Sequence, residues 1–170
     1  MNHNFLNSPA KFIYDKEGLA ELSYFWEDLY KIKGKCRPDW LSNDGNTVVD
    51  LKTTQDASPK GFQKSIANFG YHIQCAWYLR GLRKLDVPAK EFIFIAIEKT
   101  APYCIGVYRA DEDMINAGMS EVEKSLELLR ICQETKLYPD YTPTIQDISL
   151  PPWMTNKKVT PQNYQEIELY

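Results

Sequence analysis

The dipeptide Asp44-Gly45 constrains the fold more than any other feature of the chain. Asp-Gly between two strand-like segments is a strong signal for a tight β-hairpin turn. Residues 29–41 precede it and residues 47–54 (TVVDLKTT) follow it, and both segments favour strands. If the turn has two central residues, directly opposed residues carry numbers that sum to 89. The sequence therefore predicts an antiparallel hairpin of defined register.

That register places Asp39 opposite Asp50. Their Cβ atoms should lie roughly 5 Å apart on one face, and Lys52 should point to the same face. Uncompensated like charges would repel, whereas Mg²⁺ or Mn²⁺ would bind both carboxylates together with the backbone carbonyl of Leu51. The bound metal would acidify a water for attack on phosphorus, and Lys52 would orient that water or offset developing charge. The alternative is a surface hairpin in which Lys52 simply pairs with an aspartate, and spacing alone leaves both interpretations open.

The rest of the chain predicts a mixed β-sheet with flanking helices, an α/β (α+β) fold. Ser58-Pro59 is typical of a helix start, and Gly70 allows a break in the helix that follows. Strands are expected over residues 18–28, 29–41, 47–54, 91–99 and 103–110, and a long amphipathic helix over 111–136. The side chains expected to face the core from the first helical region are those of Phe62, Ile66, Phe69, Ile73 and Trp77.

Length and composition fit one domain over residues 1–170, with a core at about 18–136 and an extended, proline-rich tail at 137–170. A chain of 170 residues that is 44% apolar can bury a substantial core. The net charge of −3 indicates no global affinity for nucleic acid. Four scattered cysteines without a CxxC pair argue against a zinc site. No long apolar run or signal peptide is evident, so we expect a soluble cytoplasmic protein without a membrane partner.

Two motifs resemble the PD-(D/E)xK nuclease superfamily. Pro38-Asp39 followed by Asp50-Leu51-Lys52 is similar to its signature, and Gln74 with Tyr78 is similar to the QxxxY motif of its RecB-like and lambda-exonuclease-like branches. Within the superfamily the chain most resembles RecE-like (exodeoxyribonuclease VIII-like) phage and prophage exonucleases. The strings that carry this likeness are AELSYFW, CRPDWL, VVDLKTTQDAS and YHxQxAxY, and it extends over about residues 19–153.

The resemblance implies a restriction-endonuclease-like core and a role for each motif residue. Asp39 and Asp50 would be metal ligands, and Lys52 would be the catalytic lysine. Glu21 would be a further ligand or would orient water; the alternative is a surface glutamate on an edge strand. Gln74 and Tyr78 would position DNA or the lysine; the alternative is a polar pair that packs on the sheet.

Basic residues provide candidate phosphate contacts. Every second position along the strand that leads to Asp39 is basic, and these residues should share its face if no bulge intervenes: Lys31, Lys33, Lys35 and Arg37. Further positive charge is expected around the following helix from Lys60, Lys64, Arg80, Arg83 and Lys84. Such residues would make DNA binding depend strongly on salt. The alternative is an ordinary solvated surface.

The predicted function is a Mg²⁺-dependent deoxyribonuclease that acts on linear duplex DNA, with Mn²⁺ as a substitute ion. By resemblance it would be a 5′ to 3′ exonuclease of phage recombination that forms a homo-oligomer and works with a single-strand annealing protein. The alternatives are an endonuclease, a RecB-like module, or a DNA-binding module without turnover. Relatives carry a helical segment with a histidine ligand before the first strand. Only about eighteen residues precede that strand here, so we expect that segment to be missing.

Overall fold

The computed structural model describes residues 3–141 and 144–155, in two units divided after Lys136. The helices of the first unit are α1 (His3–Leu6), the 3-10 helix η1 (Pro9–Lys11), α2 (Phe12–Asp15), α3 (Pro59–Phe69), α4 (Tyr71–Lys84) and α5 (Glu112–Thr135). Its strands are β1 (Gly18–Ala20), β2 (Tyr24–Glu27), β3 (Lys33–Cys36), β4 (Trp40–Ser42), β5 (Thr47–Thr54), β6 (Glu91–Glu98) and β7 (Ile105–Arg109). In the second unit, the described residues form one short helix, α6 (Pro152–Thr155).

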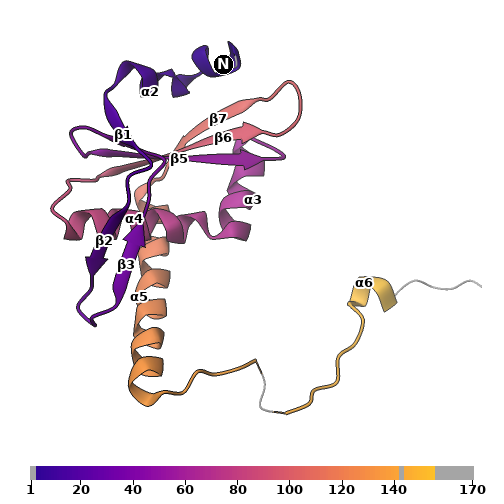
Figure 1. The fold of residues 1–170 in the computed structure, drawn as a ribbon. Helices are drawn as coiled ribbons and strands as arrows, with labels where there is room; N and C mark the ends of the chain where they lie inside the picture. The colour runs from indigo at the N-terminus through magenta and orange to yellow at the C-terminus, as the bar shows by residue number, and fades with distance from the viewer. Residues whose placement is uncertain (1–2, 142–143, 156–170) are drawn as a thin grey trace, which may run out of the picture. The chain divides into compact units, whose positions relative to one another are not determined.

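A five-stranded sheet with the order β1-β4-β5-β6-β7 forms the centre of the first unit. The pair β5 and β6 is parallel and the other neighbouring pairs are antiparallel, so the sheet is mixed. The chain passes from β5 to β6 through α3 and α4, which lie on one side of the sheet, while the N-terminal helices lie on the other (Figure 1). The predicted mixed sheet flanked by helices is confirmed.

Alternating side chains of the sheet form two cores. Val48 and Phe94 are buried on the α3 and α4 side, where Phe62 and Leu79 pack against them. A second buried cluster lies on the opposite side of the sheet and consists of Ala10, Trp40, Val49, Ile93 and Ile95. The partly buried side chains that pack against it come from the N-terminal helices: Phe5, Phe12 and Ile13. Adjacent residues of a strand point to opposite faces, so both faces of β5 are fixed by packing. The short helices between His3 and Asp15 thus cover one face of the sheet.

The predicted hairpin register is confirmed. Trp40 pairs with Val49 and Leu41 pairs with Val48, and both pairs sum to 89. The connection itself is longer than the two residues expected, since β4 ends at Ser42 and β5 begins at Thr47. Within this connection the N–H of Gly45 donates to the carbonyl of Ser42 and forms a turn. Gly45 has a φ of 72°, a conformation that favours glycine.

The strands predicted over 18–28 and 29–41 are each broken in two, and this is a correction. Glu21 has a φ of 56° and separates β1 from β2, while Pro38 lies between β3 and β4. β1 pairs with β4 in the main sheet, whereas β2 pairs only with β3 in a separate two-stranded sheet. The reason is that Trp26 of β2 packs on α4, where Gly81 leaves room for its ring. One straight strand could not both pair with β4 and pack on α4.

The helical region after β5 breaks at Gly70, as the sequence allows. Ser58 caps α3 by accepting a hydrogen bond from the N–H of Gly61, and Gly70 adopts a left-handed conformation with a φ of 66° between α3 and α4. The break changes the direction of the chain, so the single apolar face predicted for this region is wrong in part. Phe62 is buried, but the side chains of Phe69 and Ile73 are 70% and 36% exposed.

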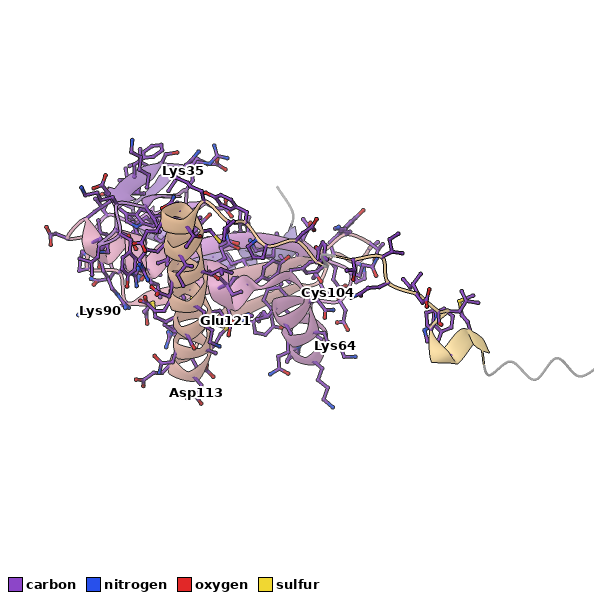
Figure 2. The ribbon with its side chains drawn as sticks, turned by 90° about the horizontal axis from the view of Figure 1, so that it is seen from below. Lys35, Lys64, Lys90, Cys104, Asp113 and Glu121 are labelled. Atoms are coloured by element: carbon purple, nitrogen blue, oxygen red, sulfur yellow. The ribbon has the colours of Figure 1, made fainter. Side chains whose placement is uncertain are left out.

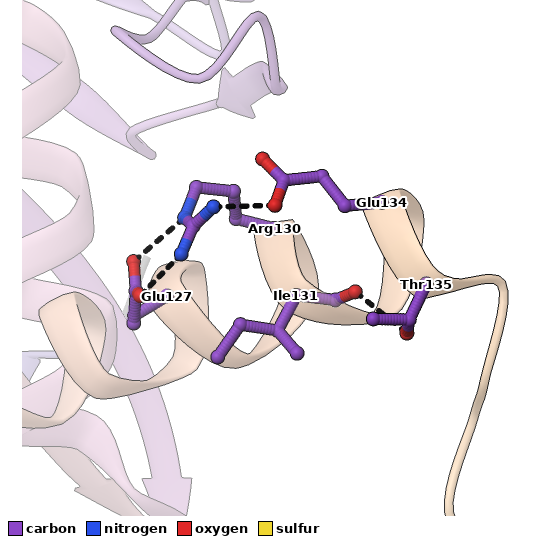
Figure 3. Close-up of polar contacts among 5 residues, drawn as sticks. All are labelled: Glu127, Arg130, Ile131, Glu134 and Thr135. Atoms are coloured by element: carbon purple, nitrogen blue, oxygen red, sulfur yellow. Dashed lines mark hydrogen bonds and ion pairs between the residues drawn. The ribbon is translucent and has the colours of Figure 1, made fainter.

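Helix α5 packs on α4 through Val122 and Leu126, and Asp111 caps its first turn. Near its end, Arg130 pairs with Glu127 at 2.7 Å and with Glu134 at 2.6 Å (Figure 3). Such exposed pairs one turn apart make only a small contribution to helix stability, because solvent screens them. No helix in the described part of the chain is long and apolar enough to cross a membrane.

Candidate active site

Asp50 is the buried centre of the candidate site. It lies on β5 with a side chain that is only 4% exposed, and it faces α4. Its Oδ2 accepts a hydrogen bond of 2.7 Å from Nε2 of Gln74, and its Oδ1 pairs with the ammonium of Lys52. Burial raises the pKa of the Asp50 carboxyl, Lys52 and Gln74 oppose this rise, and the charge of Asp39 adds to it. A positive charge placed here is therefore stabilised.

Asp39 meets β5 through a backbone contact. It lies just before β4, and its Oδ2 accepts a hydrogen bond of 2.6 Å from the N–H of Leu51. The pairing of β4 with β5 ends at Trp40 and Val49, so from Asp50 onward this edge of β5 is open to Asp39. The N–H and the C=O of a residue in a strand point to the same side. The carbonyl of Leu51 therefore points toward the edge that Asp39 occupies.

Lys52 is held by a residue that the sequence analysis missed. Its ammonium lies 4.7 Å from the centre of the Tyr71 ring, over the ring face. Tyr71 is the first residue of α4, and its ring stacks on that of Phe94 in the core. Burial raises the pKa of the Tyr71 hydroxyl, and the charge of Asp50 adds to this effect. Tyr71 precedes Gln74 by three residues, and this helical spacing is the signal that could have identified it.

Tyr78 lies one helical turn after Gln74 and contacts the segment that precedes Asp39. Its hydroxyl donates a long hydrogen bond of 3.4 Å to the carbonyl of Arg37, and its ring packs edge-on against Phe92. Burial raises the pKa of the Tyr78 hydroxyl, an effect that Gln74 opposes. The two residues of the QxxxY motif thus contact the two acidic segments of the site: Gln74 binds Asp50 directly, and Tyr78 binds the backbone before Asp39.

The backbone of Glu21 contacts that of Asp39, but its carboxylate does not join the acidic residues of the candidate site. Its N–H donates to the carbonyl of Asp39 at 3.2 Å, whereas its carboxylate pairs with Arg37 at 3.1 Å on the surface. Among the described residues, no group of three or more His, Cys, Asp or Glu side chains is placed to hold a metal ion. A metal-binding role for Glu21 stays a prediction that requires its carboxylate to leave Arg37.

The basic residues do not form the single surface that the sequence suggests. Lys35 is exposed on β3, with its ammonium 5.7 Å from the Phe25 ring centre. Lys64 lies on α3, well separated from Lys35 (Figure 2). Two of the arginines are structural. Arg80 pairs with the buried Asp28 and with Glu123, and Nε of Arg83 donates to the carbonyl of Ala89.

The donor set at the open edge of β5 fits a hard divalent cation. It consists of the carboxylates of Asp39 and Asp50 and the carbonyl of Leu51, all of which are oxygen ligands. Mg²⁺ in proteins is typically held by one or two carboxylates, with waters and substrate phosphate completing the octahedron. The raised pKa of Asp50 gives an independent reason: burial, its main cause, disfavours the charged carboxylate, the charge of Asp39 adds to this, and a bound cation would offset both effects.

Residues 2–150 match a family described as a PDDEXK-like domain of unknown function (DUF3799). The match includes every candidate residue of the site. No curated protein is significantly similar to the chain in sequence.

Solved structures with a similar fold include the "Putative exonuclease" from Eubacterium rectale. It superimposes with a TM-score of 0.63 at 16% identity, over 88% of this chain and 60% of that protein. A second structure, of SSO0001, matches with a TM-score of 0.43 at 18% identity, over 72% of this chain and 55% of that one. The chain therefore spans about 60% of the length of the Eubacterium rectale protein. At this level of identity, the first match establishes a shared fold.

Proposed function

The chain belongs to the family of PDDEXK-like domains, as its PD-(D/E)xK motif predicts, and from this premise we propose that it is a metal-dependent deoxyribonuclease. The observation that carries the proposal is the convergence on one open strand edge. Asp39 reaches the backbone of β5 beside Asp50, and Lys52 and Gln74 both contact the Asp50 carboxylate. An acidic pair, an amine and an outward carbonyl on one edge match what phosphodiester hydrolysis requires.

The carboxylates of Asp39 and Asp50 and the Leu51 carbonyl would hold Mg²⁺, with Mn²⁺ as a substitute. When bound, such an ion supplies Lewis acidity toward phosphate and lowers the pKa of water. Asp50 contributes the buried charge, and Gln74 fixes the orientation of its carboxylate through a 2.7 Å hydrogen bond. Asp39 is fixed in turn by the N–H of Leu51. Both carboxylates are thus held in place before any ligand arrives, which reduces the cost of reorganisation.

Lys52 supplies a positive charge beside the two carboxylates. In the structure it neutralises Asp50 from above the Tyr71 ring. With a cation held by the two carboxylates, the Lys52 ammonium would orient the attacking water or offset charge that builds up on the phosphate oxygens. To help deprotonate that water, Lys52 would first have to lose its own proton. Its side chain is 17% exposed, so it remains in reach of a substrate at the strand edge.

We further propose that the substrate is linear duplex DNA and that the enzyme is an exonuclease. This rests on the similarity of Gln74 and Tyr78 to the QxxxY motif, and on a fold shared with a protein whose name describes an exonuclease. The RecE-like resemblance assigns it 5′ to 3′ polarity, which leaves 3′ single strands for annealing in phage recombination.

The test is incubation of linear and closed circular duplex DNA with Mg²⁺, beside the variants Asp50→Ala and Lys52→Ala. Loss of linear DNA alone, abolished in both variants and by EDTA, supports the exonuclease. Cutting of closed circles assigns an endonuclease with the same site. DNA binding without cleavage, unchanged in both variants, would mean that the chain is a binding module and that the catalytic proposal is wrong.

A further inference from the structure

A polar cavity of about 520 Å³ lies beyond the carboxyl ends of β5 and β6. Its lining includes Thr53, Gln55, Ser65, Phe69, Tyr71 and Lys99. The two strand ends are joined there, because the N–H of Lys99 donates to the carbonyl of Thr54 at 3.0 Å. In open α/β sheets, ligands bind in the crevice outside the carboxyl ends of parallel strands, and β5 and β6 are the parallel pair of this mixed sheet. The volume is in the range of small-molecule sites.

Phe69 gives this cavity an aromatic wall. Phe69 is the last residue of α3, and the left-handed Gly70 turns the chain directly after it. The Phe69 ring stacks on the Tyr71 ring, with 5.6 Å between the ring centroids and an interplanar angle of 29°. The Phe69 side chain is nevertheless 70% exposed, although helical periodicity predicts it to be buried. A ring supported by one neighbour and open on the rest of its surface is suited to stacking with a nucleic-acid base.

Tyr71 connects the cavity to the candidate active site. The same ring that lines the cavity and supports Phe69 also lies beneath the Lys52 ammonium at 4.7 Å. A DNA strand whose phosphate is at Lys52 therefore has its neighbouring nucleotide over this cavity.

The charged and polar groups of the cavity complement one nucleotide. Lys99 is exposed at the rim and can neutralise a phosphate, while Thr53 and Gln55 are exposed hydrogen-bonding groups. Asp56 also lines the cavity, but Oδ1 of its carboxylate accepts a hydrogen bond of 2.8 Å from the N–H of Ser58 at the start of α3. Its negative charge places the phosphate on the Lys99 side.

We propose that this cavity binds one unpaired nucleotide next to the scissile phosphodiester, with its base stacked on Phe69 and its phosphate at Lys99. The inference rests on the proposed nuclease function and adds to it a substrate class. The strand end must be melted by at least one base, since a base can stack on Phe69 only after it leaves the duplex stack.

Two measurements test this proposal. The first is quenching of 2-aminopurine placed at successive positions of a single-stranded oligonucleotide, in EDTA, where no cleavage is needed. Wild type and Phe69→Trp should quench the probe at one position, and Phe69→Ala should not. The matched control is Tyr138→Ala, which removes an aromatic side chain that is 65% exposed in the second unit.

The second measurement is cleavage of duplexes that carry an abasic nucleotide at the first, second or third position from the end. Phe69→Ala should raise KM roughly tenfold, in line with the contribution of one stacked base, with little change in kcat. An abasic nucleotide at the critical position should raise the KM of wild type by a similar factor and that of Phe69→Ala no further. Lys99→Gln should also raise KM, and Lys90→Gln, an exposed lysine elsewhere, should not.

The outcomes separate the two proposals. Cleavage by wild type with an unaltered KM and unaltered quenching in Phe69→Ala overturns the nucleotide subsite and leaves the nuclease intact. Equal abasic effects in wild type and Phe69→Ala overturn the subsite in the same way. Quenching that depends on Phe69, without any cleavage by wild type, supports the subsite and overturns the nuclease proposal.

Discussion

Nε2 of Gln74 lies 2.7 Å from Oδ2 of Asp50, and this hydrogen bond joins the helix of the QxxxY motif to the strand of the DxK motif. The two residues are 24 positions apart, and the contact forms because α4 packs on the face of β5 that carries Asp50. The motif glutamine is thus a partner of the central carboxylate, which relates two sequence signatures through one physical interaction.

Replacement of Gln74 by Leu should therefore destabilise the protein and impair catalysis. It leaves an oxygen of a buried carboxylate without its donor, which costs about 1–3 kcal/mol. Urea denaturation of Gln74→Leu should show this loss. In the background Asp50→Asn the same substitution should cost less, because no buried charge is then left unpaired. Equal costs in both backgrounds would contradict the proposed link between the two residues.

The raised pKa of Asp50 predicts a pH-dependent stability with a definite sign. The folded state holds the Asp50 proton more tightly than the unfolded state does, where the pKa is near 3.8. The free energy of unfolding of wild type should therefore fall relative to that of Asp50→Asn as pH rises from about 3.8 through the folded-state pKa, and then level off. Thermal unfolding of both proteins across this range, in EDTA, gives the difference. A difference that changes in the opposite direction would show that the pairing with Lys52 outweighs burial.

Tyr71 should act as a positioning residue for Lys52. Tyr71→Phe retains the ring beneath the ammonium, so its kcat should stay within about twofold of wild type. Tyr71→Leu should lose roughly fivefold in kcat, the effect of about 1 kcal/mol of cation–π interaction. KM should change little in Tyr71→Phe, whereas Tyr71→Leu also removes the ring on which Phe69 stacks and should raise KM as well. Steady-state kinetics check this, with thermal unfolding to separate a loss of stability. If Tyr71→Phe is as impaired as Tyr71→Leu, the hydroxyl and not the ring face is what matters.

Lys35 should contribute to DNA affinity through phosphate contacts alone. Lys35→Gln should weaken binding by a similar factor for all sequences and should reduce the slope of log affinity against log salt by about 1. Lys90→Gln, at an exposed lysine before β6, is the matched control and should leave the slope unchanged. DNA-binding titrations from low to moderate salt measure the affinity and its salt slope for each protein. Identical slopes for wild type and Lys35→Gln would place Lys35 outside the DNA path.

Local patterns sufficed where neighbouring residues decide the conformation. The register of β4 with β5 follows from the turn and from alternation, the cap at Ser58 follows from its side chain, and the break at Gly70 follows from its backbone freedom. The meeting of Asp39, Asp50 and Lys52 could be predicted for the same reason, because a hairpin register relates residues that are close in sequence.

Contacts across the fold decided the rest. No local pattern indicates that the segment after Ala20 leaves the main sheet, because this depends on the packing of Trp26 against α4. Glu21 therefore pairs with Arg37 instead of joining the acidic residues. Arg80 resembles a surface cation in the sequence, but Asp28 and Glu123 meet it only after α4 and α5 have packed.

The family, the mixed fold and the acidic and basic residues on β5 follow from the amino-acid sequence alone, since each depends on motif identity or on local periodicity. Long-range packing is what places Tyr71 beneath Lys52, Gln74 against Asp50, and Phe69 at the cavity. These relations arise where helices pack on a sheet after a left-handed turn at Gly70. The side-chain directions on the two sides of that turn are set by packing, and not by helical periodicity.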